Sequence, residues 1–243
     1  MSPIVLITRP EAAAQELAQT LRQRWAPAPE IVISPILKLE FLAGDVPLQG
    51  VERLIFTSRN GVAAFARITE RRDIPCYVVG KATLTEAERH GLKATLAGRD
   101  GDELCAYLTR APERGPFLHL HGEHVAGDVA GQLRAAGRTV SEQVVYKQMP
   151  QTISDVAARH LAGLRPILLP FFSPRSAKLF FRDLRAEAPL LCAAMSPNVA
   201  DEIPPGRATC LEIARNPDLK AMLDSLDLLR EYAIELESVN RAQ

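Results

Sequence analysis

The stretch Phe56-Thr-Ser-Arg-Asn-Gly-Val62 follows the apolar pair Leu54-Ile55 and leads into a segment whose apolar residues have helical spacing. A second stretch, Phe171-Phe-Ser-Pro-Arg-Ser-Ala177, follows Ile167-Leu168-Leu169 and leads into another such segment. A short apolar run that meets a serine and then a helical period predicts a strand, a tight corner and a helix. The chain therefore carries the same serine corner twice.

The two serine corners belong to a longer repeat with an offset of about 115 residues. Leu6-Ile-Thr-Arg9, which precedes a helical segment, is echoed by Leu118-His-Leu-His121. The turn Val79-Gly-Lys-Ala-Thr83 after the first corner is echoed by Met195-Ser-Pro-Asn-Val199 after the second. Each copy has the size of a small doubly wound domain. We therefore expect two similar α/β domains with parallel sheets and a cleft between them.

Short apolar runs alternate with segments of helical period along the chain, which is the pattern of parallel α/β units. We expect strands at Ile4–Thr8, Ile31–Leu39, Leu54–Thr57, Cys76–Val79, Phe117–Leu120, Val140–Tyr146, Ile167–Phe172, Leu190–Met195 and Thr209–Ile213. We expect helices at Glu11–Arg24, Gly61–Glu70, Thr83–His90, Asp102–Thr109, Val125–Ala136, Ser154–Leu161, Ser176–Ala186, Asn198–Ile203 and Asp218–Leu236. The last helix is amphipathic and is expected to cover a sheet.

The composition argues against nucleic acid and membrane as partners. Lys+Arg and Asp+Glu both number 29, so the chain lacks the basic surplus of a general nucleic-acid binder. The first apolar run ends at Arg9 and is too short for a signal peptide, and no run approaches the length of a membrane span. The four cysteines show no short spacing typical of a zinc knuckle or a redox pair. We expect a reduced, cytoplasmic protein.

The serine corners are suited to binding anions. In a doubly wound sheet, ligands bind outside the carboxyl ends of the strands, where Thr57, Ser58 and Ser173 are expected to stand. A hydroxyl there, together with the free N–H groups of a helix start, can bind an anion, and Arg59 and Arg175 add positive charge. The alternative is that each serine only caps its helix. Two corners facing one cleft favour a ligand with several anionic groups.

Other candidate sites are weaker. His119, His121 and His124 resemble a metal cluster, but no second group of ligands completes it, so we expect no metal. The chain has no Gly-x-Gly-x-x-Gly, no P-loop and no Gly-x-Ser-x-Gly, which argues against a dinucleotide, a nucleoside triphosphate and a hydrolase triad. Tyr146 ends an expected strand, where an aromatic side chain commonly just packs on its neighbour.

Taken together, these residues resemble the uroporphyrinogen-III synthase family. The resemblance extends from the N-terminus to about residue 205, in an ordered set of short pieces. The pieces are Leu6-Ile-Thr-Arg-Pro10, Phe56-Thr-Ser-Arg-Asn-Gly-Val62, Val79-Gly-Lys-Ala-Thr83 with Gly91, Gly122 with Leu133 and Gly137, Val145-Tyr146, and Phe172-Ser-Pro174.

The resemblance implies two flavodoxin-like doubly wound domains joined by a two-stranded β-ladder. One domain would combine residues 1–36 with 149–243, and the other would span residues 40–145. The linkers would be Pro35–Glu40 and Tyr146–Met149, and the active site would lie in the cleft.

The resemblance also implies the reaction. The family converts the linear tetrapyrrole hydroxymethylbilane into uroporphyrinogen III, with loss of water and inversion of ring D, in heme biosynthesis. The substrate carries eight carboxylates, and its own reactivity asks mainly for positioning. We therefore expect a lyase that acts as a monomer and needs no cofactor.

The resemblance assigns the site residues by position. Tyr146 matches the family's tyrosine and would assist departure of the hydroxyl group. The expected substrate-binding residues are Arg9, Thr57, Ser58, Asn60, Gly80, Thr83, Gly122, Ser173, Pro174, Ser196 and Asn198. Ser196-Pro-Asn-Val199 departs from the family's common Gly-Pro-Thr-Thr, and His121 stands where an arginine is common.

Two alternatives to the enzyme stay open from the sequence alone. A non-catalytic two-lobed domain that senses a tetrapyrrole or another polyanion would share the lobes and the corners. A periplasmic binding protein would have similar lobes, but the expected absence of a signal peptide argues against it.

Overall fold

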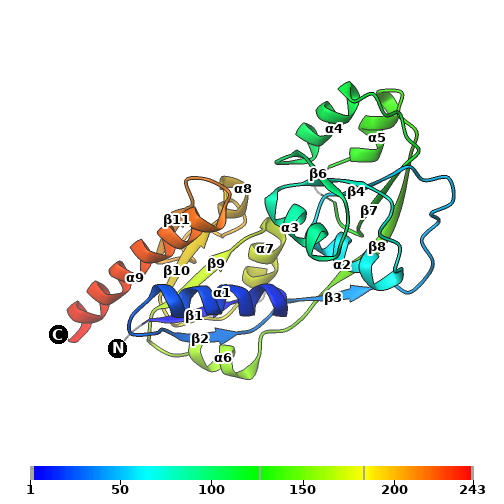
Figure 1. Cartoon of the computed structure of the whole chain (residues 1–243). Helices are drawn as coiled ribbons and strands as arrows, with labels where there is room; N and C mark the ends of the chain where they lie inside the picture. Colours follow the sequence, from blue (N-terminus) through cyan, green and yellow to red (C-terminus); the bar gives the residue numbers. More distant parts are fainter. Residues whose placement is uncertain (1–2, 126, 183, 242–243) are drawn as a thin grey trace. The chain divides into compact units, whose positions relative to one another are not determined.

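The computed structural model describes residues 3–125, 127–182 and 184–241 and divides into two units. Unit 1 consists of Met1–Lys38 and Met149–Gln243, and unit 2 consists of Leu39–Gln148. Each unit is built around its own sheet, with helices on both faces of that sheet (Figure 1). None of the described helices is both long enough and apolar enough to span a membrane.

The sheet of unit 1 has the strand order β11-β10-β9-β1-β2, and its neighbouring strands run parallel. Its strands are β1 (Ile4–Ile7), β2 (Glu30–Ile33), β9 (Ile167–Phe171), β10 (Leu190–Ala194) and β11 (Cys210–Ile213). Its helices are α1 (Glu11–Arg24), α6 (Asp155–Leu161), α7 (Pro174–Arg182), α8 (Pro197–Ala200) and α9 (Leu219–Arg241).

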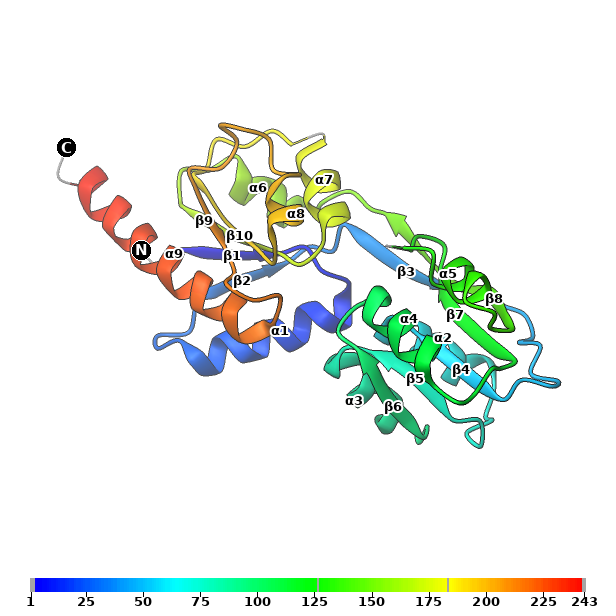
Figure 2. The same ribbon diagram turned by 90° about the horizontal axis from the view of Figure 1, so that it is seen from above.

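Unit 1 has a core on each face of its sheet because its central strands are apolar throughout. Along β1, Ile4 and Leu6 pack among residues of α6, α7 and α8, whereas Val5 and Ile7 pack among residues of α1 and α9. Consecutive side chains of a strand point to opposite faces, so a continuous apolar run supplies both cores. Figure 2 shows α1 and α9 on one side of the strands and α6, α7 and α8 on the other.

The sheet of unit 2 has the strand order β3-β8-β7-β4-β5-β6. Its strands are β3 (Leu37–Phe41), β4 (Arg53–Phe56), β5 (Cys76–Val79), β6 (Ala94–Gly98), β7 (Phe117–Gly122) and β8 (Val140–Pro150). Its helices are α2 (Arg59–Ile68), α3 (Lys81–Arg89), α4 (Gly101–Arg110) and α5 (Val129–Ala135). Helices α2 and α3 share one core with the sheet, and α4 and α5 share the other, as Figure 1 shows.

The two sheets repeat one another, as the sequence repeat predicts. In unit 1 the order β2-β1-β9-β10-β11 is the flavodoxin-like order, in which the second strand stands beside the first and the third lies on its other side. Strands β8-β7-β4-β5-β6 of unit 2 stand in the corresponding places. The predicted class, α/β with two doubly wound parallel sheets, is confirmed. The switch point, where the strand order reverses, falls between β1 and β9 in unit 1 and between β7 and β4 in unit 2.

Strands β3 and β8 form the predicted two-stranded ladder through which the chain leaves unit 1 and returns to it. The Leu42 N–H donates to the Val145 carbonyl at 3.0 Å, and the Gln151 N–H donates to the Ile36 carbonyl at 2.8 Å. The residue number rises on one strand as it falls on the other, so the ladder is antiparallel.

The predicted strand Ile31–Leu39 is wrong as a single element, because it divides into β2 and β3. Pro35 between them has no N–H for a ladder, and the Ser34 hydroxyl accepts a hydrogen bond from the Ser154 N–H at 2.8 Å. Strand β6 was not predicted, since its sequence Ala-Thr-Leu-Ala-Gly is weakly apolar and it lies at the sheet edge, where burial demands little.

Several predicted helix starts are also wrong, and α2 and α3 begin at Arg59 and Lys81, each two residues before its predicted start. Helix α5 begins at Val129 and not at Val125, because the Asp128 carboxylate caps it by accepting from the Gly131 N–H at 2.7 Å. Helix α7 begins at Pro174, two residues before the predicted start, since proline is well tolerated in a first turn. Helix α7 ends at Arg182, short of the predicted Ala186; residue 183 of that prediction lies outside the described residues.

Candidate functional site

The switch point of unit 2 brings together hydroxyl groups that lie far apart in the sequence. Ser58 follows the carboxyl end of β4 and Tyr146 lies on β8, and their hydroxyl oxygens are 3.0 Å apart, at hydrogen-bonding distance. The Ser58 hydroxyl also accepts from the Gly61 N–H at 3.2 Å, as the cap of α2. The structure therefore shows Ser58 as a helix cap whose oxygen also contacts the tyrosine, and its binding of an anion stays a prediction.

Gly122 makes room for the ring of Tyr146. The pairing of β7 with β8 shifts register between His121 and Gly122, so that Gly122 stands opposite Tyr146. A Cβ on Gly122 would lie 2.5 Å from two ring carbons of Tyr146, closer than any real contact. Only glycine at this position lets the ring lie against the β7 backbone. Tyr146 is 7% exposed and packs in the core on the side of the sheet that α2 and α3 cover. Its hydroxyl contacts the hydroxyl of Ser58.

Thr57 is the second hydroxyl at this switch point, and a histidine contacts it. The Oγ1 atom of Thr57 lies 3.3 Å from Nε2 of His119 on β7. Burial, and after it the charge of the neighbouring His121, lowers the pKa of His119 from 6.5 to about 3. His119 is therefore neutral at physiological pH and has one ring N–H and one lone pair.

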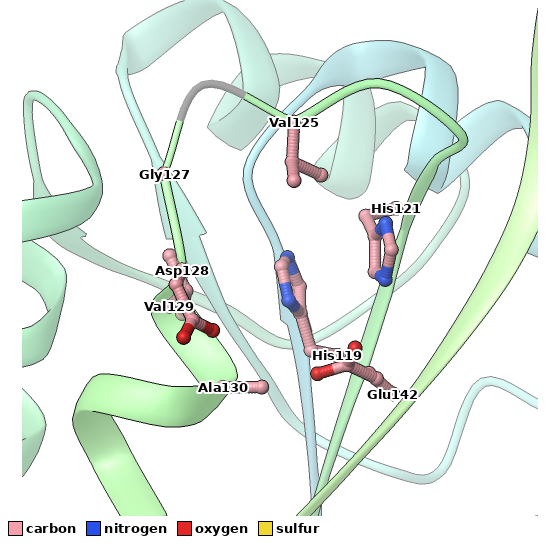
Figure 3. Close-up of a pocket in the computed structure, with 8 residues that line it drawn as sticks. All are labelled: His119, His121, Val125, Gly127, Asp128, Val129, Ala130 and Glu142. Atoms are coloured by element: carbon pink, nitrogen blue, oxygen red, sulfur yellow. The ribbon is translucent and has the colours of Figure 1, made fainter.

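His119 and His121 line a pocket of about 300 Å³ between β7, β8 and the start of α5. Figure 3 shows both imidazoles on the pocket side of β7, with Asp128, Val129 and Ala130 across from them. The ring centroids of the two histidines are 4.7 Å apart, and Nδ1 of His121 lies 2.7 Å from the Gly122 carbonyl oxygen. Carboxylates of Asp128 and Glu142 also line the pocket, so it is less suited to an anion than the serine corners are.

The three histidines of the sequence cluster are not gathered into one group in the described part of the chain. Within it, no group of three or more His, Cys, Asp or Glu side chains has an arrangement that could hold a metal ion. His124, the third member of the sequence cluster, is exposed and lies 4.0 Å from the carboxylate of Glu123.

The remaining predicted residues of unit 2 lie at the starts of helices. Gly80, after β5, has φ 75°, a left-handed conformation that favours glycine, and it is the N-cap of α3. Thr83 is buried in the first turn of α3, and its N–H donates to the Gly80 carbonyl at 3.2 Å. Asn60 is half-buried in the first turn of α2. Strand β5 neighbours β4, so both helix starts lie at the same edge of the sheet.

The switch point of unit 1 joins the end of β1 to the second serine corner. The guanidinium carbon of Arg9 lies 3.8 Å from the centre of the Phe172 ring, a cation–π contact beside Ser173. The Ser173 hydroxyl accepts from the Ser176 N–H at 3.2 Å and donates to the Ser176 hydroxyl at 2.8 Å. Pro174 is the exposed first residue of α7. Ser173 thus caps its helix as Ser58 does.

The turn after β10 presents the last two predicted residues. Ser196 is the N-cap of the short helix α8 without a side-chain hydrogen bond to that helix, and Asn198 is exposed. Val199, where the resemblance leads us to expect a polar residue, is 2% exposed and packs into the core of unit 1. The apolar side chain of Val199 is therefore part of the core, whereas Asn198 is exposed to solvent.

Helices α2 and α7, which follow the two serine corners, and helix α3 after β5 have no acidic side chains in their first turns. Helices α4 and α6, by contrast, carry Asp102 with Glu103, and Asp155, in their first turns, and α1, which follows β1 at the switch point of unit 1, carries Glu11. Since a helix N-terminus attracts negative charge, the absence of acids leaves that attraction available for a ligand.

The fold and these corners define a class of protein: a repeated flavodoxin-like α/β protein with hydroxyl groups and open helix N-termini at the switch points of its sheets. A family model, described as uroporphyrinogen-III synthase HemD, matches residues 15–224. The chain belongs to the uroporphyrinogen-III synthase family. It is accordingly an enzyme of tetrapyrrole and heme biosynthesis, a cyclising lyase.

Solved structures of this family share the fold. Uroporphyrinogen-III synthetase from Helicobacter pylori is 19% identical, with a TM-score of 0.67 over 94% of this chain and 100% of that one. A mutant uroporphyrinogen III synthase from Thermus thermophilus is 12% identical, with a TM-score of 0.55 over 95% of this chain and 100% of that one. A search of curated proteins gives no match.

Proposed function

We propose that this chain converts hydroxymethylbilane into uroporphyrinogen III with Tyr146 as the group that assists loss of water. The observation that carries this proposal is the contact between the hydroxyls of Tyr146 and Ser58, 3.0 Å apart at the switch point of unit 2. A hydroxyl held there can donate to the departing hydroxyl of the substrate while Ser58 keeps it in place.

The chemistry needs little more than this donor. The bond between the hydroxymethyl carbon and its oxygen breaks, water leaves, and the pyrrole becomes an azafulvene as its N–H proton is lost. Ring D then attacks the azafulvene carbon through its own substituted carbon, and the spiro product fragments and closes again with ring D inverted. Because the pyrrole itself drives departure of the hydroxyl, the enzyme contributes most by holding the linear tetrapyrrole in a folded conformation.

Residues at the switch points would hold the substrate's carboxylates. In unit 2 these are Thr57, Ser58 and Asn60, together with Gly80, Thr83 and Gly122 on the neighbouring strand ends. In unit 1 they are Arg9, Ser173 and Pro174, with Ser196 and Asn198 after β10. Support comes from the first turns of α2, α3 and α7, which lack acidic side chains and leave backbone N–H groups for an anion.

We further propose that the enzyme acts as a cytoplasmic monomer on this small molecule, without nucleic acid, membrane or cofactor. All four cysteines carry free thiols, which is typical of a reducing compartment. Sedimentation of the purified chain would test the monomer, and an assay in the presence of a chelator would test independence from metal.

The test of function is the isomer that the purified chain forms. Hydroxymethylbilane, generated in a coupled assay without added metal or nucleotide, is expected to give the type III isomer. Separation of the type I and type III products measures the outcome. Type I product alone, which forms spontaneously, would contradict the proposal.

The role of Tyr146 is tested by Tyr146→Phe, which keeps the ring and removes the hydroxyl. We expect kcat to fall about tenfold with little change in KM, because the hydrogen bond strengthens in the transition state and is worth about 1–1.5 kcal/mol. Tyr107→Phe is the matched control, since Tyr107 lies exposed on α4. An unchanged kcat in Tyr146→Phe would remove this hydroxyl from the reaction.

A further inference from the structure

His119 is a buried polar residue that the reaction described above does not use. It is 3% exposed and stands on β7 opposite Ile55 of β4, two residues before Thr57. Its one hydrogen-bonding contact among the described residues runs from Nε2 to the hydroxyl of Thr57, at 3.3 Å.

The two possible directions of this hydrogen bond leave Thr57 in different states. If Nε2 carries the proton, it donates to the threonine oxygen, and the hydroxyl proton of Thr57 is free for a ligand. If Nε2 carries the lone pair, it accepts that proton, and the threonine oxygen can only accept. A carboxylate offers acceptors alone, so only the first arrangement lets Thr57 bind one.

We propose that His119 is a positioning residue that donates its Nε2 proton to Thr57 and thereby turns the threonine hydroxyl into a donor for a substrate carboxylate. This inference rests on the proposed binding role of Thr57. The low pKa of His119 is compatible with this role, because a neutral imidazole carries no charge that would compete with Thr57 for the carboxylate. The neighbouring imidazole of His121 does not share the role, since its hydrogen-bonding contact runs from Nδ1 to the Gly122 carbonyl oxygen and not to Thr57.

The test is a double-mutant cycle of His119→Met and Thr57→Val, with KM and kcat measured for the formation of uroporphyrinogen III. Methionine fills a similar volume without an N–H, and valine keeps the shape of threonine without the hydroxyl. We expect each single variant to raise KM about fivefold to tenfold, the value of one hydrogen bond, with kcat changed less than twofold. The double variant is expected to match Thr57→Val alone, because His119 acts only through Thr57.

A rescue variant separates this role from packing. His119→Gln can place an amide N–H near the position of Nε2, so its KM is expected to lie within twofold of wild type. Additive effects in the cycle, or a wild-type KM in His119→Met, would overturn the proposal. So would a KM in His119→Gln as high as in His119→Met.

A second measurement needs neither variants nor activity. The ¹⁵N spectrum of the His119 ring in the wild-type protein is expected to show a protonated Nε2 and an unprotonated Nδ1. The opposite tautomer would overturn the inference even if the enzyme forms the type III isomer. A protonated Nε2 in a chain that forms only type I product would instead contradict the proposed function and leave the hydrogen bond to Thr57 in place.

Discussion

At the scale of single residues, burial decides the protonation state of His119. Its folded-state pKa of about 3 lies below the ordinary value of 6.5, because the sheet and α5 exclude the water that would solvate an imidazolium. As the pH falls below 6.5, the unfolded chain therefore takes up the proton first. The stabilisation is complete above 6.5 and is lost progressively as the pH falls toward 3.

We predict that this one group lowers the free energy of unfolding by about 2 kcal/mol between pH 7.5 and pH 5. His119→Gln has no titrating ring and should lose correspondingly less stability over the same range. Urea unfolding of both proteins, followed by circular dichroism, measures the difference. The other residues that line the pocket, Asp128 and Glu142 among them, are the same in both proteins, so the comparison isolates the imidazole. Parallel pH curves for the two proteins would contradict the assigned pKa.

At the scale of elements, the serine corners combine a structural and a proposed binding role. Ser58 caps α2 and Ser173 caps α7, each accepting an N–H from three residues later at 3.2 Å. Only two residues, of which the serine is the second, separate each strand from its helix, and this short connection keeps the hydroxyl at the carboxyl edge of the sheet. The position required for the cap is thus also the position where a doubly wound sheet binds its ligand.

We predict that Ser58→Ala and Ser173→Ala each cost about 1 kcal/mol of stability and also raise KM. The control is Ser154→Ala, since Ser154 caps α6 by accepting from the Ala157 N–H at 3.3 Å but follows no switch-point strand. It should lose similar stability with KM unchanged. Thermal unfolding and the isomer assay give the two readouts. A wild-type KM in all three variants would mean that both serines act only as helix caps.

At the scale of the whole molecule, unit 1 depends on contacts between the two ends of the chain. Helix α1 near the N-terminus and helix α9 near the C-terminus pack on the same face of the sheet. Asp227 of α9 joins this helix to the end of α1, because its carboxylate accepts from Trp25 Nε1 at 2.6 Å and from Arg24 Nε at 3.0 Å. Burial alone would raise the pKa of Asp227, but the hydrogen bonds from Arg24 and Trp25 hold it below its usual value.

We predict that Asp227→Ala lowers the stability of unit 1 by about 1–3 kcal/mol, since it leaves the Trp25 N–H and the Arg24 guanidinium without this acceptor. Asp224→Ala is the control, because Asp224 is more exposed and makes one contact with Arg24, so it should cost less than about 1 kcal/mol. Trp25 is the one tryptophan of the chain, and its fluorescence during urea unfolding reports on unit 1. Equal losses in the two variants would contradict a special role for Asp227.

The sequence by itself determined the class of fold, the repeat and the two serine corners. These features are local: an apolar run of strand length, a capping serine and a helical period are each encoded within about ten residues. The resemblance in short motifs pointed to the family and to Tyr146. The edge strand β6 was not predicted because its side chains are only partly buried. The apolar pattern by which a strand is recognised in a sequence arises from burial.

Only the tertiary structure decided which side chains meet. Ser58 and Tyr146 are 88 residues apart, and Thr57 and His119 are 62 residues apart, so no local pattern connects them. Their contacts depend on the placing of β4, β7 and β8 side by side and on the register shift at Gly122 that carries the tyrosine ring onto the β7 backbone. Strand order and register follow from packing the whole sheet against its helices, and a one-residue slip would turn every side chain to the other face. The sequence therefore indicated which kinds of residue stand at the candidate site, whereas the hydrogen bonds between them arise from the folded sheet.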